Sequence, residues 1–381
     1  MRFLHTSDWH LGRIFHGLHM TDEQAYVLDE LVQLAKEAHT DAVLIAGDLY
    51  DRSVPPTAAV TLLNEVLSRL VYEAEQNVIL IAGNHDSGER LGFAQNLLAR
   101  NRLFITGPLA ADTAPVVLQD EYGPVYFAPL TYGEPYAATE IFGTSLKTHE
   151  DVMREQIRRQ LEQIPANARK VALAHVFLTG AQECPDSERP LAIGGATTVS
   201  SQCFAAFNYT ALGHLHACQG SGTVRYSGSL MKYSFNEANQ KKGVHIIDMD
   251  AAGNITSETI ELQPRRNLAC LTGSFDDLLH NPRSEAQDNF LQITLTDEHP
   301  VLDAKYRLEQ VYPNILHLQY QRQQREVQEI NSLHKRRLAA QDLFAAFFEQ
   351  VQGRPLNDTE QKLLLSTVDA AGREEDGHEA P

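Results

Sequence analysis

Five short apolar runs in this chain each end in a cluster of aspartate, asparagine and histidine residues. In open α/β sheets, functional residues lie just beyond the carboxyl ends of the strands, so segments far apart in sequence can meet in one crevice. The pattern therefore predicts an α/β fold in which five strand ends converge. The clusters are Asp8-Trp9-His10, Gly47-Asp48, Gly83-Asn84-His85-Asp86, Ala174-His175 and Gly213-His214-Leu215-His216.

The sequence around these clusters supports a layered arrangement. Apolar runs at 43–46, 78–82, 171–174 and 209–212 indicate strands. Apolar residues also recur at helical spacing in two stripes, over 25–35 and 62–70. Two further segments, 224–227 and 244–248, indicate strands.

At 381 residues the chain is long enough for two or three folding units. We predict a first domain over 1–264 that carries all the clusters, and a small α+β capping domain over 265–325. Alternating apolar residues in the capping domain indicate strands at 291–295 and 316–320, with a helix near 303–311. A helical segment over 326–371 and a disordered acidic tail over 372–381 are expected to follow.

Each cluster taken singly has a plain structural explanation, because aspartate, asparagine and glycine favour turns and a lone histidine is more often a core residue. Five such clusters together favour a metal centre. Two cations roughly 3.5–4 Å apart can activate water and stabilise both oxygens of a phosphoryl displacement. We predict such a centre, bridged by Asp48, with these further ligands: Asp8, His10 and His216 for one ion, and Asn84, His175 and His214 for the other.

Nitrogen and oxygen ligands without thiolate fit manganese, magnesium, iron or zinc. His85 is predicted to face the substrate, where it stabilises the phosphorus centre or protonates the leaving oxygen. Asp86 follows it directly, and we expect this carboxylate to orient and charge the imidazole. The alternative for His85 is an ordinary surface histidine. For Asp51, a further ligand and an orienting partner remain equally open.

The motifs resemble those of the calcineurin-type metallophosphoesterase superfamily, whose pattern is D-x-H, G-D-x-x-D, G-N-H-D/E, a lone H and G-H-x-H. The runs His5 to Gly12, Arg225 to Ser229 and Ser234 to Glu237 more narrowly resemble the SbcD family of nucleases. The resemblance implies two central β-sheets flanked by helices. It covers the first domain well, the capping domain more loosely, and the tail only as architecture.

Resemblance to SbcD implies a manganese-dependent exonuclease on double-stranded DNA ends that also opens hairpins and cuts single strands. Such nucleases act in DNA repair, replication or recombination with an SbcC-type coiled-coil ATPase, two copies of each assembling together. At Asp51 the chain departs from archaeal and eukaryotic members, which carry a histidine there, so that histidine's role is not carried over.

Two sets of residues are predicted to bind partners. Arg13, Arg52 and Arg90 are candidates for DNA phosphates, although solvated surface arginines are the more common outcome. An apolar stripe in the C-terminal helices suits docking on the ATPase, with packing on the capping domain as the alternative. The stripe consists of Leu343, Phe344, Phe347 and Phe348.

The formal net charge of −18 argues against a protein that grips nucleic acid by itself, because phosphate binding draws on positive charge. It mildly favours the alternative of a phosphatase or small-molecule phosphodiesterase with the same centre. A non-catalytic scaffold for DNA ends is a third interpretation, but the complete ligand set speaks against it. The polar N-terminus and short apolar runs predict a cytoplasmic protein without a membrane span.

Overall fold

A computed structural model describes residues 1–184, 198–321, 348, 354–357, 359–361 and 363–364. The chain divides into two units: Met1–Leu271, Arg283–Gln292 and Val311–His317 form one, and Thr272–Pro282, Ile293–Gln310 and Leu318–Pro381 the other. The domain boundaries at 264, 325 and 371 stay predictions. Among the described residues, no helix has the length and apolar character needed to cross a membrane.

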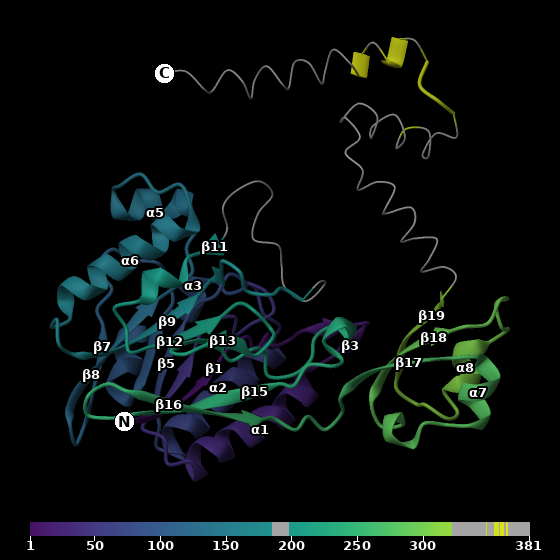
Figure 1. Ribbon diagram of the computed structural model, residues 1–381, viewed down its shortest axis with the longest axis horizontal. Coiled ribbons are helices and arrows are strands. Elements are labelled where there is room, and N and C mark those ends of the chain that lie inside the picture. Colours follow the sequence, from purple (N-terminus) through teal and green to yellow (C-terminus); the bar gives the residue numbers. More distant parts are fainter. Residues whose placement is uncertain (185–197, 322–347, 349–353, 358, 362, 365–381) are drawn as a thin grey trace. The chain divides into compact units, whose positions relative to one another are not determined.

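Two six-stranded mixed sheets form the centre of the first unit (Figure 1). The first has the order β16 (Ile255–Glu261), β15 (Gly243–Met249), β1 (Arg2–Thr6), β4 (Ala42–Ile45), β5 (Asn77–Ile81) and β6 (Leu103–Thr106). The second has the order β13 (Gln219–Ser221), β14 (Val224–Tyr226), β12 (Tyr209–Gly213), β9 (Arg169–His175), β8 (Gly123–Leu130) and β7 (Val116–Asp120). Within these, β1, β4, β5 and β6 are parallel, as are β8, β9, β12 and β14.

Alternate residues of these strands pack in hydrophobic clusters on the two faces of the sheet, because successive side chains of a strand point to opposite faces. In β1, Phe3 belongs to a cluster that also holds Val171 and Tyr209 of the second sheet, whereas Leu4 belongs to the cluster on the helical side. Both faces of the sheet are therefore apolar. This explains why the sequence shows continuous apolar runs rather than alternation.

Helices complete the layers. The first sheet shares a core with α1 (Thr21–Glu37) and α2 (Thr57–Tyr72), and the second with α6 (His149–Gln163). The predicted arrangement of two sheets flanked by helices is thus confirmed. Shorter elements are α3 (Gly88–Leu91), α4 (Gln95–Leu98), η1 (Ala99–Asn101), α5 (Pro135–Phe142), η2 (Ser201–Phe204), η3 (Phe235–Glu237) and the strand pairs β2 (Ile14–Phe15) with β3 (Leu18–His19) and β10 (Phe177–Leu178) with β11 (Thr198–Val199).

A three-stranded sheet follows in the chain, in the order β17 (Leu268–Gly273), β18 (Phe290–Leu295) and β19 (Ile315–Tyr320). The strands predicted at 291–295 and 316–320 are confirmed. The helix expected near 303–311 is shorter, α8 (Ala304–Leu308). Within residues 265–320, three elements were not predicted from the sequence: β17, α7 (Phe275–His280) and η4 (Ser284–Ala286).

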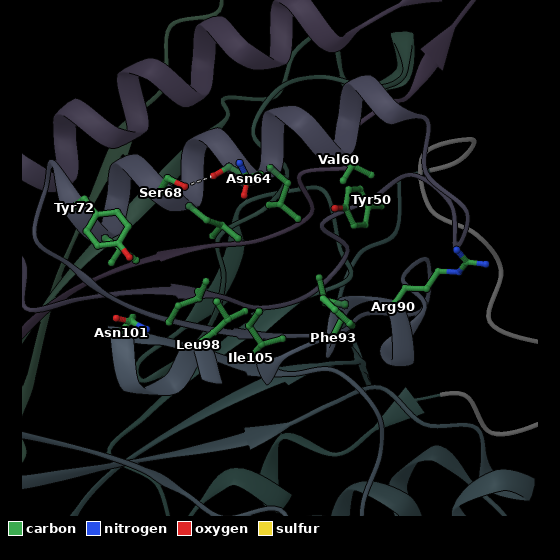
Figure 2. A pocket seen from close by; sticks show the side chains of 15 residues that line it. Tyr50, Val60, Asn64, Ser68, Tyr72, Arg90, Phe93, Leu98, Asn101 and Ile105 are labelled. Atoms are coloured by element: carbon green, nitrogen blue, oxygen red, sulfur yellow. Dashed lines mark hydrogen bonds between the residues drawn. The ribbon is translucent and has the colours of Figure 1, made fainter. Parts of the chain in front are cut away.

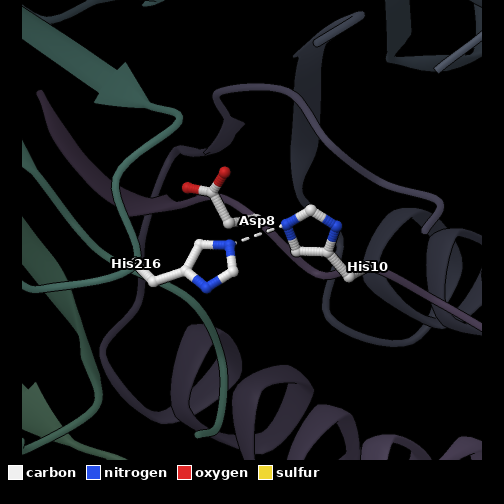
Figure 3. A group of neighbouring side chains, drawn as sticks. All are labelled: Asp8, His10 and His216. Carbon is white, nitrogen blue, oxygen red and sulfur yellow. Dashed lines mark hydrogen bonds between the residues drawn. The ribbon is translucent and has the colours of Figure 1, made fainter. Parts of the chain in front are cut away.

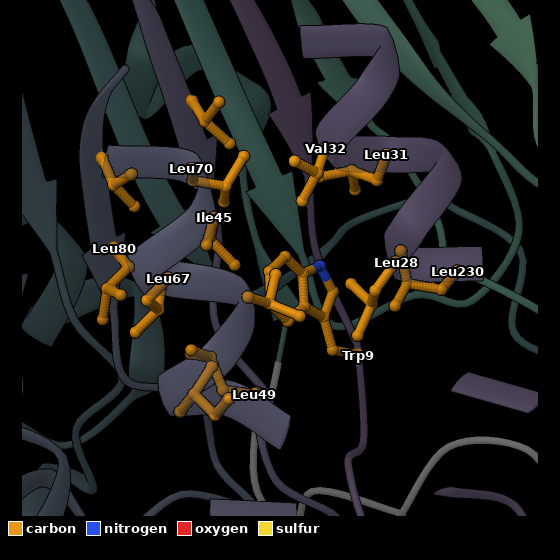
Figure 4. Close-up of a cluster of buried hydrophobic side chains, with 14 of the residues drawn as sticks. Trp9, Leu28, Leu31, Val32, Ile45, Leu49, Leu67, Leu70, Leu80 and Leu230 are labelled. Atoms are coloured by element: carbon orange, nitrogen blue, oxygen red, sulfur yellow. The ribbon is translucent and has the colours of Figure 1, made fainter. Parts of the chain in front are cut away.

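The loop after β1 is anchored by Trp9, which has no exposed surface. Its side chain lies in the apolar cluster with Leu28 of α1, Leu67 of α2 and Leu49 (Figure 4). Its indole N–H donates to Oγ1 of Thr6 at 3.0 Å. Because Trp9 stands between two predicted metal ligands, its burial fixes the position of both.

Replacement of Trp9 by alanine should destabilise the protein by about 3–5 kcal/mol, because it removes a large buried side chain from a packed core. The free energy of unfolding is measured by chemical denaturation of the metal-free protein. Tyr136→Ala is the matched control, since this aromatic side chain on α5 is 78% exposed. A loss below about 1 kcal/mol for Trp9→Ala would show that the loop is held by other contacts.

Candidate metal centre

The predicted strand ends meet at one edge of the two sheets. In the first sheet, Thr6 of β1 pairs with Ile45 of β4, which in turn pairs with Leu80 of β5. In the second sheet, Gly213 of β12 pairs with His175 of β9. The ligand clusters therefore leave their strands at the same level of each sheet, as the sequence predicted.

The first predicted ligand group comes together. Asp8, His10 and His216 offer ligand atoms that all lie within 4.8 Å of one another, and all three residues are buried. Figure 3 shows the two imidazoles facing each other, with 2.9 Å between the Nε2 atoms of His10 and His216. At most one proton fits between two ring nitrogens this close. The two lone pairs thus point to one position, as in a pair of metal ligands.

The second predicted group also comes together. Nε2 of His175 lies 2.9 Å from Oδ1 of Asn84 and 3.4 Å from Oδ2 of Asp48. Nδ1 of His214 lies 3.2 Å from the same oxygen of Asn84. The amide oxygen is thus shared between two imidazoles, as expected of groups that surround one cation.

Two carboxylates border both groups. Oδ2 of Asp48 lies 3.4 Å from Nε2 of His175 and 3.7 Å from Nε2 of His10, one imidazole of each predicted ion. This is the position that a bridging ligand needs. Asp8, which the sequence assigned to one ion, forms a ligand cluster with His10 and His216 and another with Asp48 and His175.

The backbone is strained around the ligands. Asp8, His10, Asp48 and His214 adopt positive φ angles of 53°, 47°, 53° and 105°. Such conformations cost about 1–3 kcal/mol each and persist only where the surrounding structure enforces them. A Cβ atom on Gly83 would lie 2.2 Å from Oδ1 of Asp48, so this close approach of two loops requires glycine.

The charges inside the centre depend on one another. Burial, together with the charge of Asp48, raises the pKa of Asp8 to about 6. Although burial acts in the opposite direction, His175 holds the pKa of Asp48 well below its usual range, and Asp48 in turn raises the pKa of His175 to about 9. Burial lowers the pKa of His214 to about 3 and that of His10 well below its usual value. Near neutral pH the imidazoles of His10 and His214 are therefore neutral and offer lone pairs. The proton on His175 occupies a position that a cation can take in its place. The donor set thus fits divalent cations.

Asp86 does not orient His85, which corrects the expectation from the sequence. Its carboxylate accepts main-chain N–H bonds from Leu49, Tyr50 and Gly83 at 3.1, 2.9 and 3.0 Å. Asp86 therefore fastens the Asp48 loop to the Asn84 loop. The adjacency of two residues in sequence could not reveal that their side chains point to different partners.

His85 borders the centre. Its Nδ1 lies 2.8 Å from the main-chain oxygen of Asp51, and its Nε2 lies 3.9 Å from Oδ2 of Asp48. A carbonyl oxygen only accepts hydrogen bonds, so Nδ1 carries a proton. The nitrogen that faces the centre is therefore Nε2.

Both roles left open for Asp51 stay predictions, because its carboxylate forms a candidate ligand group with His10 and His85 and also lies near the second ring nitrogen of His10. Its Oδ1 lies 4.0 Å from Nδ1 of His10, the ring nitrogen that points away from His216. This buried Nδ1 has no hydrogen-bond partner within the described part of the chain. Metal-binding histidines almost always donate their second N–H to a carboxylate, carbonyl or water.

The three predicted phosphate contacts differ in their surroundings. Arg13 donates to Asp51 at 2.9 Å and lies over the ring of Tyr233, with a side chain only 17% exposed. The guanidinium of Arg13 thus already has two partners within the protein. Arg52 and Arg90 are exposed and stay predicted DNA contacts.

The sequence did not predict the partners of His216. Oε1 of Glu237 lies 3.2 Å from its Nδ1, and Nζ of Lys242 lies 2.6 Å from the other oxygen of this carboxylate. In the sequence, the run Ser234 to Glu237 is distinguished only by its resemblance to the SbcD family. No spacing or periodicity connects it to a histidine that lies 21 positions earlier in the chain.

Comparison with known proteins gives a consistent picture. Residues 1–218 match the family model of calcineurin-like phosphoesterases, and residues 264–352 match a model described as the type 5 capsule protein repressor C-terminal domain. The chain is 32% identical over 322 residues to the D subunit of the nuclease SbcCD from Staphylococcus epidermidis, a match that covers 84% of this chain and 85% of that protein.

Two solved structures resemble the fold more loosely. The protein TT1561 of Thermus thermophilus gives a TM-score of 0.40 at 16% identity, covering 68% of this chain and 98% of that one. A dimetal phosphatase from Danio rerio gives a TM-score of 0.35 at 10% identity, covering 69% and 99%.

Replacement of Asp48 by asparagine should abolish binding of both ions, because its carboxylate oxygen borders both ligand groups. The stoichiometry of Mn²⁺ binding is measured by calorimetry and by elemental analysis after gel filtration. Asp22→Asn, an exposed acidic residue on α1, should bind like the wild type. Two ions bound to Asp48→Asn with wild-type affinity would contradict the bridging position.

Proposed function

Because the chain belongs to the calcineurin-like phosphoesterase family and to its SbcD-type nucleases, we propose that it hydrolyses phosphodiester bonds in DNA at a dinuclear metal centre. The observation that carries this proposal is the position of Asp48 between the two groups of predicted ligands, with its Oδ2 3.7 Å from Nε2 of His10 and 3.4 Å from Nε2 of His175. Sequence similarity that extends beyond the centre, into the C-terminal part of the chain, supports the nuclease over other members of the family.

Different residues of the chain are proposed to bind the two ions and to transfer a proton. Asp8, His10 and His216 would hold one ion, Asn84, His175 and His214 the other, and Asp48 both. When bound, two divalent cations supply an activated water and stabilise the charge that develops on the phosphate oxygens. The Nδ1–H of His85 is fixed on the carbonyl of Asp51, so Nε2 is the nitrogen that faces the substrate. It would give a proton to a phosphate or leaving oxygen when the ring carries protons on both nitrogens.

Among the cations that this ligand set accepts, manganese is the one we propose, because the chain resembles SbcD nucleases over 322 residues. The proposed substrates are double-stranded ends, cut exonucleolytically, and hairpins and single strands, cut endonucleolytically. These activities would serve DNA repair, replication or recombination. A protein that acts on the chromosome in this way works in the cytoplasm.

The acidic composition limits how the protein can hold DNA. It has 50 acidic residues against 32 lysines and arginines, so its overall field repels the phosphate backbone. The bound cations, the exposed Arg52 and Arg90, and a partner protein would supply the attraction. The same composition favours the second candidate, a phosphatase or small-molecule phosphodiesterase.

The proposed partner is an SbcC-type coiled-coil ATPase, since the relative from Staphylococcus epidermidis is a subunit of SbcCD. Of the predicted docking stripe, Leu343, Phe344 and Phe347 lie outside the described residues. Phe348 is half-buried, with the guanidinium of Arg354 5.1 Å from its ring centre. Docking of this stripe on the ATPase stays a proposal.

A homodimer within the assembly is also proposed. Between α2 and the segment that follows α3, an apolar groove opens to solvent (Figure 2). Phe93, Leu97 and Tyr72 in this region are 81%, 68% and 68% exposed. Exposed apolar area of this kind marks surfaces that bind other proteins, and a second copy of the chain is the proposed occupant.

Replacement of His85 by glutamine should leave two ions bound but lower the rate of cleavage by about 10²–10⁴-fold, the range of a lost general acid. Turnover of duplex DNA and Mn²⁺ stoichiometry are measured on the same preparation. His280→Gln, an exposed histidine on α7 that belongs to no predicted ligand group, is the control. Full activity of His85→Gln would refute the assigned role.

The substrate class is tested with linear duplex DNA, hairpin DNA and a generic aryl phosphodiester, each offered with Mn²⁺ and an SbcC-type partner. Cleavage of both DNAs is expected, and it should disappear in Asp48→Asn. Turnover of the small ester alone would leave the metal chemistry intact and establish the phosphodiesterase alternative instead.

A further inference from the structure

One ligand, His216, is held at both its ring and its backbone by a buried ion pair. Oε1 of Glu237 lies 3.2 Å from Nδ1 of the imidazole. Nζ of Lys242 donates to the main-chain oxygen of His216 at 2.7 Å and lies 2.6 Å from Oε2 of Glu237. The three residues thus close a ring of contacts. Glu237 has no exposed surface and Lys242 only 4%.

Burial of such a pair is costly unless its remaining polar atoms are satisfied. The second oxygen of Glu237 also accepts the main-chain N–H of Tyr233 at 3.2 Å, and Nζ of Lys242 donates to Oε1 of Gln240 at 2.9 Å. The polar atoms of the buried pair are therefore satisfied by hydrogen bonds. The pair contacts His216 on the side of the ring away from His10, which is where a residue that orients this imidazole would lie.

The contacts fix the state of the imidazole. The ammonium of Lys242 lies 2.6 Å from Oε2 of Glu237, and the main-chain N–H of Tyr233 donates to the same oxygen at 3.2 Å, so the group that faces His216 is a carboxylate. A carboxylate accepts, so Nδ1 donates to it and Nε2 keeps its lone pair toward His10. At Nδ1 of His175, by contrast, the partner is the main-chain oxygen of Ala46, at 2.9 Å.

We propose that Glu237 and Lys242 are positioning residues that set the tautomer and orientation of His216 for one of the two cations. The inference rests on the proposed function, because it presupposes a dinuclear centre. Carboxylates in this position raise the basicity of the histidine, and their loss typically weakens metal binding by about 10–100-fold. The effect should fall on the ion held by Asp8, His10 and His216 and spare the other.

The test uses the full chain and Mn²⁺ alone. Because Glu237→Gln leaves a buried ammonium without its counter-charge, the main variant is the charge-neutral double replacement Glu237→Gln/Lys242→Met, with Glu237→Gln as the second. Calorimetry should show one site weakened by about 10–100-fold and one unchanged. Electron paramagnetic resonance should show the spin-coupled signal of two neighbouring Mn²⁺ ions replaced by that of an isolated ion.

The matched control is Lys241→Met/Glu261→Gln. This neighbouring pair has the same residue types at 2.9 Å but is 82% and 44% exposed and touches no predicted ligand. It should bind two ions like the wild type. Wild-type affinities in the folded double variant would overturn the positioning role, and so would failure of both variants to fold without metal, which would make the pair a folding element. A wild type that binds fewer than two ions would refute the proposed function instead.

Discussion

Two carboxylates, Asp8 and Asp48, are buried together among imidazoles, and the protein is built around the need to balance their charge. Buried charge is tolerated only where opposite charge and hydrogen bonds compensate it. Without metal, the proton on His175 provides part of this balance. Two divalent cations carry four positive charges, which leaves a surplus for a hydroxide and a phosphodiester after both carboxylates are neutralised. The same arrangement would thus both hold the proposed cations and attract the proposed substrate.

The predicted ligands are held in place by contacts in the sheets, in the core and directly around the centre. Parallel strands bring ligand loops from both sheets to one edge, and Trp9 anchors the first of these loops in the core. Asp86 then ties the loop of Asp48 to that of Asn84 through main-chain N–H bonds. Glu237 and Lys242 act one layer further out, on the ring and backbone of His216. Most of these supports are hydrogen bonds between segments that are far apart in sequence.

Much of the fold and of the ligand set could be predicted from the sequence, because strands buried on both faces leave continuous apolar runs. Residues that follow directly on such strands share their edge, so the meeting of His175 and His214 could be predicted without a structure. Side-chain direction within a loop follows no such rule. Asp86 adjoins His85 in sequence yet turns toward main-chain N–H groups, and Glu237 reaches His216 only through the fold. Short elements such as β17 and α7 were missed because their patterns are brief.

The claim that two cations share Asp48 is tested most directly by anomalous diffraction from crystals of the protein grown with Mn²⁺. Two peaks should appear, roughly 3.5–4 Å apart, on either side of the Asp48 carboxylate, one beside His10 and His216 and the other beside His175 and His214. A single peak at saturating Mn²⁺, or two peaks that do not both contact Asp48, would contradict the account.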